Sequence, residues 1–194
     1  MSPAPEEPGR SRDSGMTLVE LLVAMSIGIV VLLLVGATMY RTLVTQRDVT
    51  SLTQATNQAQ TAAASVERSV RNATAVSHLT TPSGVEILRM RTRTGSAGGA
   101  STRCEAYAYD PSAHTLRRTT AASAIDPATS STWSLIIDKV SPSTGTALLP
   151  LTTVAGRSQV ALSFSVAAGK VKPVEVESVV YPLPSSDTGS APCF

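Results

Sequence analysis

The longest apolar run of the chain lies near its N-terminus, at residues 21–40. It reads LLVAMSIGIVVLLLVGATMY, twenty residues without a charge. At about 1.5 Å per residue, a helix of this length spans about 30 Å, the thickness of the hydrocarbon core of a bilayer. Because a bilayer offers no water to unpaired backbone groups, the run predicts a membrane-spanning helix.

Helical periodicity continues beyond this run. Neither Pro nor Gly occurs between Ala37 and Pro82. Small and apolar residues recur at spacings that place them on one helix face: Leu52, Ala55, Ala59, Ala62, Val66 and Val70. The pattern predicts one helix from about residue 16 to about residue 72. Its outer half is expected to pack this stripe against the rest of the chain.

Strand-like runs between turn residues replace the helical period from residue 78 onward. The runs predicted as strands are 85–92, 103–110, 114–120, 133–140, 159–166 and 174–181. Residues 95–99 (GSAGG) and 121–132 are predicted as loops. Short connections favour an antiparallel sheet with one face on the helix. The predicted fold class is therefore α+β: a long N-terminal helix, half membrane-spanning and half amphipathic, packed on an antiparallel β-sheet head.

Composition narrows the function classes. The net charge of +2, from 16 basic and 14 acidic residues, argues against a nucleic-acid binder that works through bulk charge, and no direct nucleic-acid site is evident. Two Cys and two His are too few for a zinc ribbon. Neither an HExxH, a complete phosphate loop nor a GxSxG elbow occurs. We therefore predict no catalytic residues, no metal site, no cofactor and no enzymatic activity.

Two acid–base pairs close in sequence and both histidines suggest no further site. Glu67 with Arg71 and Glu86 with Arg89 are predicted as solvated surface pairs, each worth under about 1 kcal/mol. His78 and His114 are predicted to be isolated, since they are beside turn or loop residues and belong to no metal-ligand spacing.

Glu20 is anomalous because it is a carboxylate at the margin of the apolar run. An ionisable group there is costly unless it is paired or close to the interface.

Residues 1–15, with three Pro and no apolar face, are predicted to be disordered. An ordinary signal anchor and a secretory signal cleaved near residues 35–37 are two interpretations. Acidic residues stand where a secretory signal has its basic segment.

A third interpretation accounts for the polar N-terminal segment, Glu20 and the apolar run together. The stretch SGMTLVELLVAMSIGIVVLLL resembles the leader junction of type IV pilins and pseudopilins. The resemblance implies that a prepilin peptidase cuts after Gly15 and that the new N-terminus at Met16 is N-methylated. It also implies that Glu20, the fifth residue after the cut, serves assembly. Family leaders are usually short and basic, whereas this one has only Arg10 and Arg12 as bases.

Weaker resemblances extend beyond the leader junction. Residues 66–73 (VERSVRNA) resemble the end of the long helix in J-type secretion pseudopilins and W-type minor pilins. A CxxYxYDxxxxxLxR hairpin resembles the same group and comprises Cys104, Tyr107, Tyr109, Asp110, Leu116 and Arg118. The implied function is a minor structural subunit that primes or caps a pilus, a DNA-uptake pilus or a type II secretion pseudopilus. The alternative is a single-pass anchored extracytoplasmic binding protein that forms no fibre.

The resemblance also implies an organisation, a location and partners. Residues 1–15 are the expected leader, 16–40 the transmembrane and assembly half of the helix, 41–77 its outer half and 78–194 the β-rich head. The N-terminus is expected inside and the head outside the cytoplasmic membrane, before transfer into an extracytoplasmic fibre. The expected partners are the prepilin peptidase, the cytoplasmic membrane and other pilin or pseudopilin subunits, which pack through the N-terminal helix.

The two cysteines, Cys104 and Cys193, are the only thiols of the chain. In an exported head, a disulfide between them is expected, since disulfides persist outside the cytoplasm. It would close a loop of about 90 residues and hold a polar C-terminal tail. Two independent reduced thiols are the alternative.

Overall fold

The computed structural model describes residues 17–94, 101–143, 145, 147–183 and 193–194. Two compact units divide the chain, one at residues 1–46 and the other at residues 47–194. The predicted leader at residues 1–15, Met16 and the predicted loop at residues 95–99 lie outside the described residues.

The described part of the first unit is helical. Helix α1 extends over Leu18–Arg71 and supplies every described residue of this unit except Thr17. By length and composition, α1 is the one helix in the described part of the chain that could cross a membrane. The predicted helical state of the apolar run is therefore confirmed.

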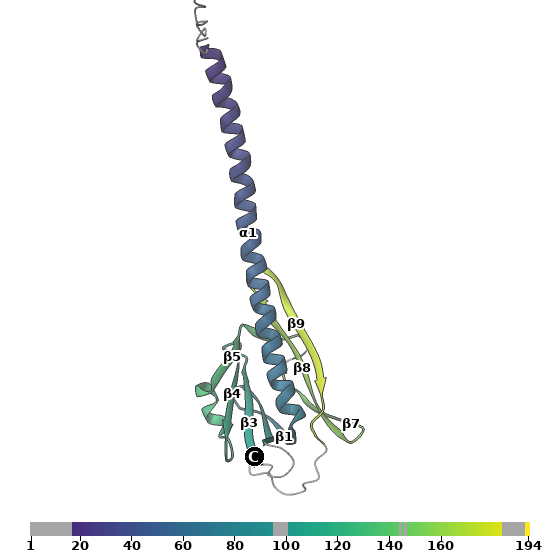
Figure 1. The fold of residues 1–194 in the computed structure, drawn as a ribbon. Helices are drawn as coiled ribbons and strands as arrows, with labels where there is room; N and C mark the ends of the chain where they lie inside the picture. The colour runs from purple at the N-terminus through teal and green to yellow at the C-terminus, as the bar shows by residue number, and fades with distance from the viewer. Residues whose placement is uncertain (1–16, 95–100, 144, 146, 184–192) are drawn as a thin grey trace, which may run out of the picture. The chain divides into compact units, whose positions relative to one another are not determined.

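The second unit contains the end of α1 and two antiparallel sheets. The first sheet has the order β1-β2-β3-β4-β5. Its strands are β1 (Ala73–Thr80), β2 (Glu86–Thr94), β3 (Ser101–Asp110), β4 (Thr115–Ala121) and β5 (Ser134–Asp138). A short 3₁₀ helix, η1 (Pro127–Thr132), precedes β5. Figure 1 shows these strands beside the last turns of α1.

The second sheet is built around its longest strand, β8 (Arg157–Ala168). One edge of β8 pairs with β6 (Val140–Pro142) and β7 (Leu151–Val154), and the other edge pairs with β9 (Val171–Val180). This α+β arrangement, a long N-terminal helix packed on antiparallel sheets, confirms the predicted fold class.

The main core joins the end of α1 to both sheets. Five of the six residues of the predicted helix stripe are buried: Ala55, Ala59, Ala62, Val66 and Val70. Leu52 departs from the prediction and remains 38% exposed. Small side chains along the helix let β-strand side chains such as Tyr107 and Phe164 approach it closely.

A second cluster covers the opposite face of the first sheet. Alternation along β2 and β3 turns Ile87, Cys104 and Ala106 away from the helix. There they pack with Trp133 and Cys193. The first sheet is consequently buried on both faces over part of its area.

Three features differ from the sequence predictions. Strand pairing begins at Ala73 rather than near residue 78, because β1 pairs with β2 over its whole length. The predicted strand at 133–140 is divided between the two sheets at Lys139, whose φ of 56° turns the chain. Strand β7 was not predicted, since its four residues are mostly exposed and carry little alternation.

Candidate functional site

The first turn of α1 positions Glu20 at the start of the apolar helix. The Thr17 carbonyl accepts the Leu21 N–H at 3.1 Å, and the Thr17 hydroxyl accepts the Glu20 N–H at 3.3 Å. Thr17 is therefore the N-cap, and Thr-x-x-Glu has the spacing of a capping box. A carboxylate here also lies at the positive end of the helix dipole.

The Glu20 carboxylate has no cation within ion-pair distance among residues 17–94 or the other described segments. Its side chain is exposed. Gly15 and Met16, the other two residues predicted for processing, precede the described part of the chain. The contacts of Thr17 thus hold the backbone of Glu20, and the described residues supply no cation for its exposed carboxylate.

The helix that follows Glu20 exposes its apolar side chains in every direction. Between Leu18 and Val44, the large hydrophobic residues of α1 are all at least 40% exposed. A Cβ added at Gly28 or Gly36 would meet nothing within 4 Å. Such a surface is stable only when lipid or other helices cover it.

The predicted β3–β4 hairpin contains the six residues of the CxxYxYDxxxxxLxR pattern, and each has a structural contact. Tyr109 and Leu116 are a cross-strand pair buried in the core. Tyr107 is opposite Arg118, whose guanidinium lies 5.9 Å from the tyrosine ring centre. Tyr107, Tyr109, Leu116 and Arg118 therefore share the face of the hairpin toward the helix, whereas Cys104 faces the second cluster and Asp110 lies at the turn.

A buried carboxylate, Glu105, organises that interface. It forms an ion pair with Arg118 and accepts hydrogen bonds from the Ser69 hydroxyl at 2.7 Å and the Tyr107 hydroxyl at 3.1 Å. Tyr107 is also 3.0 Å from the Ser65 hydroxyl. Burial raises the pKa of Tyr107, so the phenol remains protonated and keeps donating at neutral pH. The network fastens the last turns of α1 to β3.

Asp110 closes the β3–β4 turn. One of its carboxylate oxygens accepts the Ser112 hydroxyl at 2.7 Å, the Ser112 N–H at 2.9 Å and the Ala113 N–H at 3.3 Å. The Ser112 hydroxyl bond is the main cause that lowers the pKa of Asp110. Because a lowered carboxyl pKa favours the folded state above the ordinary pKa, this contribution disappears as the pH falls through the lowered value.

The structure corrects the sequence predictions for Glu86 and for His78. It is buried, and its partner is His78, with Nε2 3.0 Å from Oε1, rather than Arg89. Its two oxygens also accept the backbone N–H groups of Leu148 at 2.7 Å and Leu149 at 2.8 Å. Glu86 therefore ties the segment before β7 to the first sheet, and His78 is not isolated.

The other predicted surface pair exists and has an added partner. Arg71 and Glu67 form an ion pair of 3.2 Å one helical turn apart. Glu67 also accepts the Ser178 hydroxyl at 2.7 Å, which connects α1 to β9. His114 lies 3.2 Å from the Ser141 hydroxyl at the surface.

The sequence predictions missed the burial of Glu86 and Glu105, although the strand pattern indicates it for both. Glu86 shares a strand face with Leu88 and Met90, and Glu105 shares one with Tyr107 and Tyr109. An acidic residue on the apolar face of a strand is expected to find hydrogen-bond donors inside the protein. In the described residues, no group of three metal-ligating side chains gathers.

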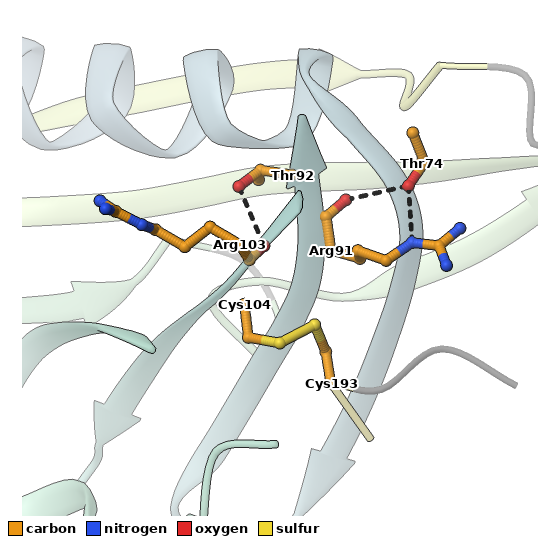
Figure 2. The surroundings of a disulfide bond; sticks show 6 residues. All are labelled: Thr74, Arg91, Thr92, Arg103, Cys104 and Cys193. Carbon is orange, nitrogen blue, oxygen red and sulfur yellow. Dashed lines mark hydrogen bonds between the residues drawn. A yellow bond between two sulfur atoms is a disulfide. The ribbon is translucent and has the colours of Figure 1, made fainter. Parts of the chain in front are cut away.

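The disulfide between Cys104 and Cys193 connects β3 to the C-terminus of the chain. Their Cα atoms are 5.2 Å apart and the two residues are 89 positions apart in the sequence. Figure 2 shows the bond beside Arg91 of β2 and below Thr92, with Cys193 on the outer face of the sheet. The terminal Phe194 follows it, and the Arg89 guanidinium lies 5.5 Å from its ring centre. These contacts hold the end of the chain on the second cluster.

Comparison with known protein families matches only the N-terminal segment. Residues 10–36 match the family model described as the prokaryotic N-terminal methylation motif. The chain carries this motif. No curated protein and no solved structure matches the chain.

The matched motif includes Glu20 and the first part of the exposed apolar helix. The motif is typical of type IV pilins and pseudopilins, and it supports a pilin-like protein of a kind that a prepilin peptidase processes. It implies assembly with other pilin subunits, and with the apolar helix it indicates membrane anchoring. Pilin-like proteins are structural rather than enzymatic. The match does not extend to the head.

A substitution tests the Glu86 contacts. In Glu86→Ala, we expect the free energy of unfolding of the head to fall by about 3 kcal/mol, since two buried N–H groups lose their acceptor. Denaturant unfolding of the full chain in detergent, followed by fluorescence of the single Trp133, measures the loss. Glu175→Ala is the control because Glu175 is exposed on β9. Equal losses in the two variants would contradict this role of Glu86.

Proposed function

We propose that this chain is a minor structural subunit that primes or caps a type IV pilus-like fibre, either a pilus, a DNA-uptake pilus or a type II secretion pseudopilus. The observation that carries the proposal is the methylation motif at residues 10–36. Within this range Glu20 is the fifth residue after Gly15, and it belongs to an exposed apolar helix. The hairpin pattern between Cys104 and Arg118 supports a minor subunit of the J or W type.

In this proposal the chain has four parts. Residues 1–15 are a leader removed after Gly15, and Met16 becomes the N-methylated N-terminus. Residues 16–40 anchor the subunit in the cytoplasmic membrane and later pack in the fibre, and the outer half of the helix ends at Arg71 rather than at residue 77. The head, which begins with β1 at Ala73 rather than at residue 78, lies outside the membrane.

Glu20 has a defined physical role in such a fibre. Inside a bundle of apolar helices, a carboxylate needs a cation, and the α-amino group at Met16 of a neighbouring subunit supplies one. The Thr17 cap fixes the position of the Glu20 backbone at the helix start. Pairing of the two groups would then set the axial register between subunits.

N-terminal sequencing of the protein recovered from cells tests the proposal. A chain that begins at Met16 supports processing by a prepilin peptidase. A chain that retains residues 1–15 would instead favour the single-pass anchored binding protein, which forms no fibre.

The Glu20→Gln variant separates processing from assembly. Membrane insertion and cleavage should continue, since removal of a charge eases insertion and the cut precedes Glu20. Incorporation into sheared fibres should fall, because a buried α-amino group without its counter-charge costs about 3 to 5 kcal/mol. Quantitative immunoblots of fibre and membrane fractions measure the effect. Normal incorporation would show that Glu20 does not set the register.

A further inference from the structure

A pocket of about 470 Å³ lies on the face of the first sheet that is turned away from α1. Two cross-strand pairs of the β3–β4 hairpin contribute to its lining, Ala108 with Arg117 and Asp110 with Thr115. Residues of η1 and of the turn before β2 complete the described lining of this hairpin pocket. Its volume falls in the range of about 300 to 1,000 Å³ that is usual for small-molecule sites.

The described residues of the C-terminal tail are held at the other end of this sheet. The Leu183 N–H bonds the Ala73 carbonyl at the start of β1, at 3.0 Å. Cys193 is bonded to Cys104, near the start of β3. The hairpin pocket is instead at the end of β3, where Asp110 is the last residue. Neither of these two attachments of the tail therefore reaches the pocket.

Hydroxyl side chains supply much of the polar lining of the hairpin pocket: Ser83, Ser112, Thr115, Ser130 and Ser131. Within the described part of the chain, the side chains of Ser130 and Ser131 make no hydrogen bond. The Thr115 hydroxyl oxygen is buried and also has no partner there. Because a buried polar atom without a partner is rare, the Thr115 hydroxyl indicates that the pocket receives a hydrogen-bonding group.

One acid and one base, Asp110 and Arg117, belong to the described lining and form no ion pair with any described residue. The bonds that Asp110 accepts from Ser112 and Ala113 all end on Oδ1, so Oδ2 has no hydrogen bond among the described residues. Arg117 Nη1 donates to the Trp133 carbonyl at 2.9 Å, and its other N–H groups make no bond in the same part of the chain. The pocket therefore offers a carboxylate acceptor and guanidinium donors.

The presence of both charges limits the chemistry of a ligand. Arg117 repels a cation and Asp110 repels an anion. Among the described residues, no group of three metal-ligating side chains gathers. An apolar ligand would leave the carboxylate and the hydroxyls without partners. A neutral hydroxyl both donates and accepts, so it can pair with the carboxylate, the guanidinium and the serine and threonine hydroxyls. A molecule with several adjacent neutral hydroxyls, a saccharide, fits these conditions.

We propose that the hairpin pocket binds a neutral saccharide unit. Oδ2 of Asp110 accepts a hydrogen bond from a sugar hydroxyl, and Arg117 donates to a sugar oxygen. The hydroxyls of Thr115, Ser130 and Ser131 pair with further hydroxyls of the same unit. The inference goes beyond the proposed function, because binding by the head requires no fibre.

Saturation-transfer NMR on the full chain, in a detergent without a sugar headgroup, tests the proposal. The probes are glucose, galactose and N-acetylglucosamine, each supplied as the free monosaccharide and as the end of a neutral oligosaccharide. Glycine and inorganic phosphate are the charged comparisons. We expect transfer to at least one sugar, and the form with the stronger transfer identifies a free sugar or a glycan as the source. Transfer to none of the sugars, or equal transfer to glycine or phosphate, would overturn the inference.

A substitution that fills the pocket locates the binding. Ala128 is an exposed residue of η1 in the pocket lining, so Ala128→Phe should occupy the pocket and abolish transfer to the sugar. Ala122→Phe is the matched control, because Ala122 is exposed and lies outside the lining. Equal transfer in the two variants would show that the sugar binds elsewhere and would overturn the inference.

The Thr115→Val variant separates binding from folding, since it replaces the hydroxyl by a methyl group. Because the Thr115 hydroxyl has no partner among the described residues, the free energy of unfolding of the head should not fall. The Kd for the sugar, from a titration of the transfer signal, should rise about fivefold through loss of one hydrogen bond. A lower stability with an unchanged Kd would show that this hydroxyl serves the fold and would contradict its place in the site.

Discussion

Reduction of the Cys104–Cys193 disulfide should lower the free energy of unfolding of the head by about 4 to 5 kcal/mol. The bond joins residues 89 positions apart, and the chain-entropy model assigns this magnitude to a loop of that length. A domain is usually stable by only about 5 to 15 kcal/mol, so the loss is a large fraction of the total. Reduction should also loosen the C-terminal tail, since Cys193 holds it on the second cluster.

Denaturant unfolding of the full chain, with and without reductant, measures this difference. The double variant Cys104→Ser/Cys193→Ser is the matched control, because reductant should leave its stability unchanged. A thiol reagent applied to the native, unreduced protein provides an independent test. Labelling of two free thiols would refute the bridge.

Replacement of Gly15 by leucine should abolish leader removal. The peptidase must approach the backbone closely at this position, and a bulky side chain prevents that approach. Gly15→Ala should mostly be tolerated, because a methyl group adds little volume. Gel mobility and N-terminal sequencing of the membrane-bound protein distinguish the two variants. Exposure of Met16 in Gly15→Leu would contradict the assigned cleavage position.

Local patterns predicted the helix and the central hairpin well. The charge-free run at residues 21–40 and the stripe from Ala55 to Val70 are periodicities within one element, so no distant contact was needed to recognise them. The β3–β4 hairpin was equally local, with alternation on either side of a turn. Its end at Asp110 follows from hydrogen bonds that Asp110 accepts from Ser112 and Ala113.

The division into two sheets depends on contacts that local patterns do not contain. Residues 133–140 form a plausible single strand, but Lys139 turns the backbone and β6 pairs with β8 instead of β4. Glu86 was assigned to Arg89, three residues away, whereas its backbone partners lie 62 and 63 positions further along. The face shared by Glu86 and Leu88 indicates burial but does not identify those partners.

Some features around the candidate site can likewise be recognised from local sequence, and others only from the assembled fold. Glu20 and its place after Gly15 form a short linear motif, and the sequence alone contains it. The place of β1 at the end of the first sheet's strand order is a property of the assembled sheet, because it depends on which described strands pair with it.

The disulfide also imposes an order of events on the newly made protein. Cys193 lies 89 positions after Cys104, which belongs to the middle strand of the first sheet. Because the chain is synthesised from its N-terminus, all five strands of the first sheet are made before Cys193. Cys104 therefore gains this partner only after those strands exist, and the outer cluster, which includes Cys193, is completed only then.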